Sequence, residues 1–395
     1  MIDEEFPYPL NTGKRIRTFS LTKALAGHNE VAYLAYGSEK SESFNFLQDS
    51  NFVCYAVPPP DRRQEGPKFY LKLLGNLFSP LPYIVTSHYT KRFERRLHEL
   101  QTEHRFDIVI CEWTPYAIFI KELRGAKSII VAHNIEAKIW RRYEQNETNT
   151  LKKAYIKIQR NKVEAFEKSC FIWSNGAISV SDAEAAEIAS YGVGYKVQTV
   201  ENGVDINYFQ PLEVFVDPNT LVFTGAMDWR PNQDAVKFFV REILPLVKKR
   251  RPEVKIAFVG RMPPKPIREL GRIEGVTVTG TVEDVRPYIA AAALYVVPLR
   301  IGGGSRLKIL EAMAMKKPVL STTVGAEGLN VTAGKNILLA EGPEQFAGQV
   351  VSYLDNPERL ADLAAAGRQL VEEQYRWEKL GEKLHHYLSD IMATP

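Results

Sequence analysis

The chain has 395 residues, of which 45% are hydrophobic, 25% charged and 11% aromatic, and these proportions exclude a disordered, collagen-like or coiled-coil protein. Its net charge of +4 is too small to indicate nucleic-acid binding, and three widely separated cysteines argue against a disulfide framework or a zinc site. No apolar run reaches the length of a membrane span and we expect no secretory signal, so we predict a reducing, cytoplasmic location.

Short apolar runs alternate with amphipathic stretches along the whole chain. Several runs are continuously apolar or β-branched, which is typical of parallel strands buried on both faces of a sheet. The predicted strands cover residues 30–36, 106–111, 128–132, 176–180, 220–224, 254–259, 276–279, 293–298 and 318–321. Helices are expected between them, for example over residues 234–250 and 306–315, so the pattern predicts the doubly wound sheets of an α/β protein.

The alternation runs twice, once before residue 200 and again after residue 220. Two turn signals, Asn202-Gly203 and Asp217-Pro218, lie between the two rounds. We therefore predict two Rossmann-like domains, residues 1–205 and 212–378. They are expected to face each other across a cleft lined by the carboxyl ends of their strands, where open α/β sheets bind ligands.

The beginning of the chain is unusual for such a domain. Only Met1-Ile2-Asp3 precedes a loop-like segment over residues 4–9, whereas a doubly wound domain normally opens with a longer buried strand. One hypothesis is that most of the natural first strand is missing from this sequence. The alternative is a first strand that is truly short.

The strongest chemical signal lies between residues 297 and 314, where a predicted strand leads through three glycines into a helix. Glycines bring backbone amides close to a ligand, and a helix start carries a partial positive charge. Arg306 and Lys308 add two cations that oppose the helix dipole unless an anion binds there. We therefore predict a phosphate or diphosphate site, with Glu311 as an acceptor for a ribose diol. Its loop residues are Gly302, Gly303, Gly304 and Ser305.

This segment resembles the donor domain of the GT-B glycosyltransferases, specifically the retaining family 4 enzymes. Four further motifs resemble the family in the same order, namely LVFTGAM at 221–227, FVG at 258–260, VTGTVEDV at 278–285 and STTVGAEGL at 321–329. In the family, the third motif holds the nucleotide base through its backbone. The resemblance therefore assigns Thr281 and Val282 to the nucleotide-sugar site.

Two departures from the family pattern concern the donor site. The family usually has a glutamate eight residues before the position of Glu311, and this chain has Gly303 there. The family also often has an arginine and a lysine after the first strand of the donor domain, where this chain has neutral residues. We expect Arg306 and Lys308 to supply the missing positive charge, with Arg230 as a weaker candidate.

In the first domain, the segment before the first helix resembles the glycine loop of the family. That loop sits over the donor phosphates and the acceptor. The resemblance assigns Gly13 to the nucleotide sugar, and it assigns Lys14 and Arg17 to the acceptor. A lone glycine at a helix start is otherwise more often a simple turn.

Polar residues also follow two predicted strands of the first domain. His133 resembles the family histidine that contacts the donor sugar, although a lone histidine is otherwise more often structural. Glu136 lies one helical turn later, and Glu112-Trp113 ends the preceding strand. We predict that these three residues shape the acceptor pocket.

The resemblance implies transfer of a glycosyl group from a nucleotide diphosphate sugar to an acceptor hydroxyl, with retention of configuration, in polysaccharide or glycolipid synthesis. His133, Arg306 and Lys308 would be the catalytic residues, since positive charge stabilises the departing diphosphate. No metal and no cofactor is expected. The last helix, residues 379–395, would pack back on the first domain. A sugar-nucleotide epimerase of the same fold and a non-catalytic sugar-nucleotide-binding protein are the alternatives.

Two stretches of the first domain are locally basic. Residues 61–105 contain nine Lys or Arg against five acids, and residues 138–163 contain eight against two. Such a stretch is either a surface for anionic lipid headgroups or a solvated helix face, and no motif accompanies it that would indicate nucleic acid. The expected partners are a nucleotide-sugar donor, a glycan or lipid-linked acceptor, and an anionic membrane surface on the inner face of the membrane.

Overall fold

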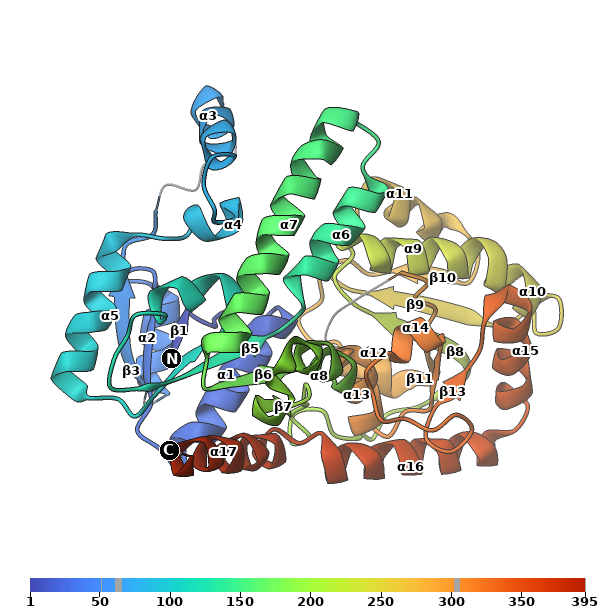
Figure 1. The fold of residues 1–395 in the computed structure, drawn as a ribbon. Helices are drawn as coiled ribbons and strands as arrows, with labels where there is room; N and C mark the ends of the chain where they lie inside the picture. The colour runs from blue at the N-terminus through green and yellow to red at the C-terminus, as the bar shows by residue number, and fades with distance from the viewer. Residues whose placement is uncertain (51, 61–65, 302–305, 395) are drawn as a thin grey trace. The chain divides into compact units, whose positions relative to one another are not determined.

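The computed structural model describes residues 1–50, 52–60, 66–301 and 306–394, and the chain divides into two compact units. Unit 1 consists of residues 1–201 together with 380–395, and unit 2 consists of residues 202–379. Each unit contains its own β-sheet and its own helices (Figure 1).

Unit 1 is built on a seven-stranded parallel sheet with the order β3-β2-β1-β4-β5-β6-β7. Its strands are β1 (Ile2–Asp3), β2 (Ala32–Tyr36), β3 (Val53–Val57), β4 (Ile108–Cys111), β5 (Lys127–Ala132), β6 (Gly176–Ser179) and β7 (Val197–Thr199). The strand order reverses between β1 and β4, which makes their carboxyl ends the switch point where such sheets bind ligands.

The helices of unit 1 connect these parallel strands. They are α1 (Gly13–Ala26), α2 (Glu42–Asp49), α3 (Pro67–Asn76), α4 (Tyr83–Thr86), α5 (Lys91–His104), η1 (Thr114–Phe119), α6 (Glu136–Asn146), α7 (Thr150–Trp173), α8 (Asp182–Ile188), η2 (Ala189–Val193) and η3 (Gly194–Lys196). Alternate residues of β2 enter two different apolar clusters, Leu34 and Tyr36 in one and Tyr33 and Ala35 in the other. The sheet is therefore buried on both faces, as the continuous apolar runs indicate.

Unit 2 is built on a six-stranded parallel sheet with the order β10-β9-β8-β11-β12-β13. Its strands are β8 (Asp217–Thr224), β9 (Lys255–Val259), β10 (Val276–Val278), β11 (Ala292–Val297), β12 (Val319–Ser321) and β13 (Leu338–Leu339). Its helices are α9 (Arg230–Phe238), η4 (Phe239–Ile243), α10 (Leu244–Lys248), α11 (Lys265–Arg268), η5 (Glu269–Arg272), α12 (Arg286–Ala291), α13 (Leu307–Ala314), α14 (Thr323–Ala326), α15 (Gly342–Leu354) and α16 (Pro357–Gln374). The order reverses between β8 and β11, so the second switch point lies at their carboxyl ends.

Two glycines let the chain turn closely at this second switch point. Gly225 follows β8 and Gly260 follows β9. A side-chain carbon on Gly260 would come within 1.8 Å of the Gly225 carbonyl oxygen, so no other residue fits there without a shift of the backbone. The glycines of the motifs at 221–227 and 258–260 are thus required because the two turns approach each other too closely for a side chain.

The last helix, α17 (Trp377–Ala393), brings the end of the chain to unit 1. The Tyr387 hydroxyl accepts a hydrogen bond from the Ala177 amide of β6 at 2.9 Å, and it lies within donor distance of the Lys196 carbonyl. Gly176 allows this approach, since a side-chain carbon there would lie 2.3 Å from the same hydroxyl. Residues 380–395 therefore belong structurally to the first half of the chain.

All nine predicted strands are present, within a few residues of their predicted ends. Asp217-Pro218, predicted as a turn, instead begins β8, so that prediction was wrong. The proline ring costs no ladder bond with β9, because the pairing of β8 with β9 begins at Thr220, whereas β8 pairs with β11 from Asp217.

Candidate functional site

The first group of site residues surrounds the turn after β8 in unit 2. The Lys308 ammonium of α13 lies against this turn, because a side-chain carbon on Gly225 would stand 2.8 Å from it. Lys308 donates a hydrogen bond to the Asn232 side chain at 2.8 Å, and its ammonium lies 4.1 Å from the centre of the Phe223 ring. Asn232 is itself buried and bonds to the Ala226 carbonyl. A single cation is thus fixed at the switch point of the sheet.

Lys308 and Glu311 lie one turn apart on α13 and are both half-buried. Burial lowers the pKa of Lys308 to about 7, against the opposing effect of Glu311. Burial also raises the pKa of Glu311 to about 7, and the Lys308 charge only partly offsets it. Among the described residues, no hydrogen-bond partner for the Glu311 carboxylate is found. The carboxylate therefore has acceptor capacity available to a ligand.

Arg306 precedes α13 in the left-handed conformation, with φ at 50°, and is 8% exposed. Its guanidinium donates to the Glu327 carbonyl at 3.3 Å and to the Glu327 carboxylate at 3.1 Å. The two cations at this helix start therefore have partners within the chain. Helix-dipole opposition alone does not require a bound anion here. The stronger indication is the position of the Lys308 ammonium against the glycine turn.

The other predicted donor residues are more exposed. Arg230 is the first residue of α9 and is exposed; within the described part of the chain, no contact of its guanidinium is found. Thr281 is exposed and Val282 is half-buried, and both follow β10 at the carboxyl edge of the sheet. The loop residues Gly302, Gly303, Gly304 and Ser305 lie outside the described residues.

The second group of site residues surrounds the switch point of unit 1. Asp3 ends β1, is 2% exposed, and accepts hydrogen bonds from the Tyr33 hydroxyl at 2.9 Å and the Lys14 ammonium at 2.7 Å. Lys14 also pairs with Glu4 at 2.8 Å and lies 5.5 Å from the centre of the Trp113 ring. Burial raises the pKa of Asp3 in spite of Lys14, whereas the two carboxylates raise the pKa of Lys14 in spite of burial.

Glu112 links β4, β5 and α1 at the same edge. It follows β4, is 5% exposed, and accepts hydrogen bonds from the Thr18 hydroxyl and from His133 Nε2, each at 3.1 Å. Burial would raise the pKa of Glu112, but the contact with His133 and the nearby charges of Arg17 and Lys14 lower it. Because an ionised carboxylate only accepts, His133 Nε2 is the donor in this contact.

Trp113 and Glu136 form a further pair beside Glu112. The Trp113 indole donates to the Glu136 carboxylate at 2.8 Å. Burial raises the pKa of Glu136, and the indole hydrogen bond only partly counters that effect. The amides of Glu136 and Ala137, which start α6, both donate to the Glu167 carboxylate of α7 at 2.9 and 3.2 Å. Of the acceptor-site residues predicted from the sequence, Lys14, Glu112, Trp113 and Glu136 thus lie near the carboxyl ends of β1, β4 and β5, in three separate hydrogen-bonded groups.

Two family models match the chain. The model described as "Glycosyltransferase Family 4" matches residues 17–208, and the model described as "Glycosyl transferases group 1" matches residues 218–356. The chain belongs to the family 4, group 1 glycosyltransferases. Both its fold and its enzyme class are therefore those that the sequence motifs indicate.

The glycosyltransferase is similar to several individual proteins. An uncharacterized 44.6 kDa protein in the cps region of Klebsiella pneumoniae is 22% identical, over 96% of this chain and 97% of its own length. A GDP-mannose-dependent alpha-(1-6)-phosphatidylinositol monomannoside mannosyltransferase of Mycobacterium tuberculosis is 26% identical over an aligned region that covers 51% of this chain and 57% of that enzyme. The Anabaena protein HepE, solved with UDP and glucose, superposes with a TM-score of 0.64 at 13% identity, over 98% of each chain.

One predicted site residue of the glycosyltransferase makes a structural contact. Arg17 is 1% exposed, and its guanidinium donates to the carbonyls of Val200 at 2.7 Å and Glu201 at 2.6 Å. Its side chain ties α1 to the segment after β7, a structural contact that the assignment of Arg17 to the acceptor did not anticipate. The physical reason is that α1 turns this position inward. Gly13, in contrast, is the first residue of α1 and is only half-buried.

Several residues of the two clusters were missed by sequence reasoning. Asp3 ends a strand of only two residues, and Asn232 and Thr18 lie inside helices with no motif around them. Only the tertiary fold brings them to the strand ends. Among the described residues, no group of three or more His, Cys, Asp or Glu side chains is placed to hold a metal ion, and none of the described helices is long and apolar enough to cross a membrane.

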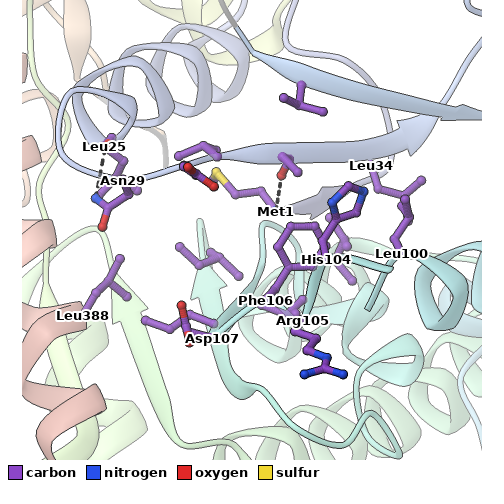
Figure 2. Close-up of a pocket in the computed structure, with 18 of the residues that line it drawn as sticks. Met1, Leu25, Asn29, Leu34, Leu100, His104, Arg105, Phe106, Asp107 and Leu388 are labelled. Atoms are coloured by element: carbon purple, nitrogen blue, oxygen red, sulfur yellow. Dashed lines mark hydrogen bonds between the residues drawn. The ribbon is translucent and has the colours of Figure 1, made fainter. Parts of the chain in front are cut away.

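A cavity of about 660 Å³ lies in unit 1, at the opposite edge of the sheet from Glu112 and His133. Figure 2 shows Met1 at this cavity, together with Phe106 and Asp107 before β4, and Leu388 of α17. The cavity lies between the amino-terminal portions of β2 and β4, in line with β1. Doubly wound sheets bind ligands at the carboxyl ends of their strands, so we do not assign the transferase site to this cavity.

Proposed function

We propose that this glycosyltransferase moves a sugar from a nucleoside diphosphate sugar to an acceptor hydroxyl, with retention of configuration and without a metal ion. The Lys308 ammonium, half-buried and held against the glycine turn by Asn232, is the observation that carries the proposal. A diphosphate leaving group gains negative charge as its bond to the sugar breaks, and a fixed cation in a water-poor site stabilises that charge. Arg306 and the amides of the neighbouring loop are assigned the same task.

Glu311 is assigned to the ribose of the donor. Its carboxylate lies one turn from Lys308 on α13 and has acceptor capacity for a diol. Thr281, Val282 and Arg230 are assigned to the rest of the nucleotide, and Gly13 to the donor phosphates. Support for a nucleotide donor also comes from the solved Anabaena protein, which holds UDP.

The acceptor is assigned to unit 1. Glu112, Trp113, Glu136 and Lys14 would form the acceptor site, and His133 would contact the transferred sugar through Nδ1. In the proposed reaction, a bond forms between the acceptor oxygen and the anomeric carbon while the bond to the diphosphate breaks. A phosphate oxygen of the leaving group takes the acceptor proton, so no dedicated protein base is required. Polysaccharide or glycolipid synthesis is the proposed setting, with an anionic membrane surface as a further partner.

Thermal unfolding with UDP, GDP and ADP tests the donor site. A nucleotide at one hundred times its dissociation constant adds about 2.7 kcal/mol of stability. We expect one nucleotide to stabilise the wild-type protein, and to stabilise Lys308→Ala and Glu311→Ala much less. Lys335→Ala and Glu344→Ala, which alter exposed residues of the same unit, are the matched controls and should respond as wild type does. A wild-type protein that none of the nucleotides stabilises would contradict the proposal.

Product analysis then separates transfer from related reactions. With the stabilising nucleotide identified, its sugar conjugates are incubated with and without glycan or lipid acceptors. Sugar attached to an acceptor, with the anomeric configuration of the donor, is the expected product. An altered free sugar formed without any acceptor would instead identify a sugar-nucleotide epimerase.

A further inference from the structure

Helix α3 carries a row of large apolar side chains that unit 1 leaves exposed. Tyr70, Leu71 and Leu74 are 63%, 66% and 58% exposed, and Phe78, just beyond the helix, is 93% exposed. Tyr70, Leu74 and Phe78 follow one another at intervals of four residues, and Leu71 lies three residues before Leu74, so all four point to one side of the helix. The opposite side, with the half-buried Leu73 and the buried Asn76, faces the protein. The exposed row is therefore not the packing face of α3.

The carboxyl end of α3 is fixed to the long helix α7. The buried Gln159 side chain donates to Asn76 Oδ1 at 2.8 Å, and Asn76 donates in turn to the Leu81 carbonyl at 3.1 Å. The Lys162 ammonium donates to the carbonyls of Asn76 and Ser79, each at 2.7 Å. Figure 1 shows α3 projecting away from the sheet of unit 1. These bonds hold the projecting helix in place.

A second exposed apolar patch lies where α6 meets α7. Tyr143 is 59% exposed, and Leu151, in the first turn of α7, is 82% exposed. Lys152 and Lys153 are exposed in the same turn, which contains no acidic residue, so both cations oppose the helix dipole. Leu151 lies eight residues before Gln159, which corresponds to about 12 Å along α7. Both patches therefore lie near the junction of α3 and α7.

Both segments are basic and free of acidic residues. Residues 66–93, which include α3, contain four Lys or Arg and no Asp or Glu. Residues 148–163, which include the first half of α7, contain five Lys or Arg and no Asp or Glu. Glu144, on the neighbouring helix, pairs with Arg160 at 3.2 Å. Exposed apolar side chains are thus combined with positive charge.

We propose that the α3 row (Tyr70, Leu71, Leu74 and Phe78) and the α7 tip (Leu151, Lys152 and Lys153) dock unit 1 on an anionic lipid bilayer. Apolar side chains enter the boundary between headgroups and acyl chains, and lysines contact the anionic headgroups. A projecting helix with an apolar outer face and flanking cations suits a lipid surface better than a protein partner, which would have to supply a groove for it. This inference specifies the membrane contact of the proposed function but does not depend on sugar transfer.

Vesicle flotation with the full chain tests this surface without any donor or acceptor. The protein should float with vesicles of phosphatidylcholine and phosphatidylglycerol, less so with phosphatidylcholine alone, and binding should fall as salt is raised. Phe78→Ser and Leu71→Ser should each lower the partition coefficient by about tenfold, since burial of one large apolar side chain is worth at least a decade. Lys152→Glu with Lys153→Glu should remove most of the dependence on anionic lipid.

Matched variants in unit 2 test whether the loss of any exposed apolar side chain, or of any exposed positive charge, weakens flotation. Phe215→Ser changes another phenylalanine that is 85% exposed, and Lys249→Glu with Arg250→Glu changes another adjacent pair of exposed cations. Both controls should float as the wild type does, and every variant should unfold at the wild-type temperature. Unimpaired flotation of Phe78→Ser or Leu71→Ser would overturn the proposal. Self-association of the wild-type protein that these substitutions abolish would overturn it in favour of a contact between two copies.

Discussion

At the residue scale, the Glu112 carboxylate decides which nitrogen of His133 is available to a ligand. The carboxylate accepts from His133 Nε2 at 3.1 Å and is held ionised by its neighbours, so the ring is expected to be the Nε2–H tautomer. The Glu112→Gln variant offers the ring either a carbonyl oxygen that accepts or an amide N–H that donates, and it should weaken this preference. Imidazole ¹⁵N shifts of the ligand-free protein measure the tautomer directly.

The control for Glu112 is a variant of its other partner. Thr18→Val removes the second hydrogen bond to the carboxylate, at 3.1 Å, and leaves the contact with His133 in place. In this variant the His133 ring should remain the Nε2–H tautomer. An Nδ1–H ring in the wild-type protein would contradict the assignment, and with it the proposal that Nδ1 contacts the sugar.

Lys308 gives donor binding an expected pH dependence. Its pKa is lowered to about 7 in the ligand-free site, so the ammonium loses its proton as pH rises above 7, whereas a diphosphate favours the protonated form. Affinity for the stabilising nucleotide should therefore fall above pH 7, by up to about tenfold per pH unit. Titration calorimetry in buffers of different ionisation enthalpy should show proton uptake on binding.

An arginine at the same position tests the cause of that dependence. Lys308→Arg keeps its charge at all pH values of interest, so any binding that it supports should no longer weaken between pH 7 and 9. Its hydrogen bond to Asn232 would be lost or altered, which makes weaker binding overall the expected outcome. An alkaline decline that persists unchanged in Lys308→Arg would mean that another group titrates.

The residue pairs also show where sequence reasoning stopped. His133 and Glu112 follow adjacent parallel strands, so the sequence alone indicates that they lie at one edge of the sheet. Glu327, the partner of Arg306, lies 21 residues away in a loop that no local pattern connects to α13. The same holds for Arg17, whose inward direction depends on packing against residues about 180 positions later. Strand-end positions are predictable because topology sets them, whereas long-range partners are not.

At the element scale, α6 depends on a cap from another helix. Ile135, which precedes α6, provides no side-chain cap, and the Glu167 carboxylate of α7 accepts from the first two amides of α6 instead. Glu167→Ala should lower the free energy of unfolding by about 1–3 kcal/mol, because two buried amides lose their acceptor. Chemical denaturation measures the change, and Glu164→Ala on the same helix, which is only half-buried, should have a smaller effect.

The same carboxylate should make stability pH-dependent. Burial raises the pKa of Glu167 to about 8, above its value in the unfolded chain, in spite of the two amide bonds. The unfolded state therefore releases this proton first, and its contribution to stability is full below about pH 4.5 and is lost as pH rises to about 8. Glu167→Gln cannot titrate and should flatten the stability profile in that window. A profile of unchanged slope would rule out Glu167 as its origin.

The elements themselves were largely predictable. Nine apolar runs mark nine strands, since burial of both sheet faces requires continuous apolar sequence. The strands that were missed include β7 and β13, which have three and two residues and are too short for any periodicity. β3 was also missed, although its sequence VCYAV is a visible apolar run. The helix expected over residues 234–250 begins four residues earlier and continues through a wider turn, η4, before Pro245.

At the scale of the whole molecule, the two units have separate cores that share no residue. The apolar cluster of unit 2 runs from Val204 to Tyr375 in the sequence, and two apolar clusters of unit 1 lie before residue 198, although α17 adds buried side chains such as Leu384 to unit 1. Helix α17 begins at Trp377, after the residues of unit 2, but from residue 380 onward it belongs to unit 1. Its Tyr387 hydroxyl satisfies the Ala177 amide inside the sheet. Helix α17, at the end of the chain, thus contributes to the stability of unit 1.

Tyr387→Phe should therefore weaken unit 1 selectively. The variant keeps the ring and leaves the buried Ala177 amide without its acceptor, at a cost of about 1–3 kcal/mol. Hydrogen exchange followed by mass spectrometry should show faster exchange in β6 and β7 and unchanged exchange in β8 and β11, because the cores are separate. Tyr353→Phe, in unit 2, leaves every amide of unit 1 satisfied and should spare β6 and β7. Equal acceleration in both sheets of Tyr387→Phe would instead mean that the two cores unfold as one cooperative unit.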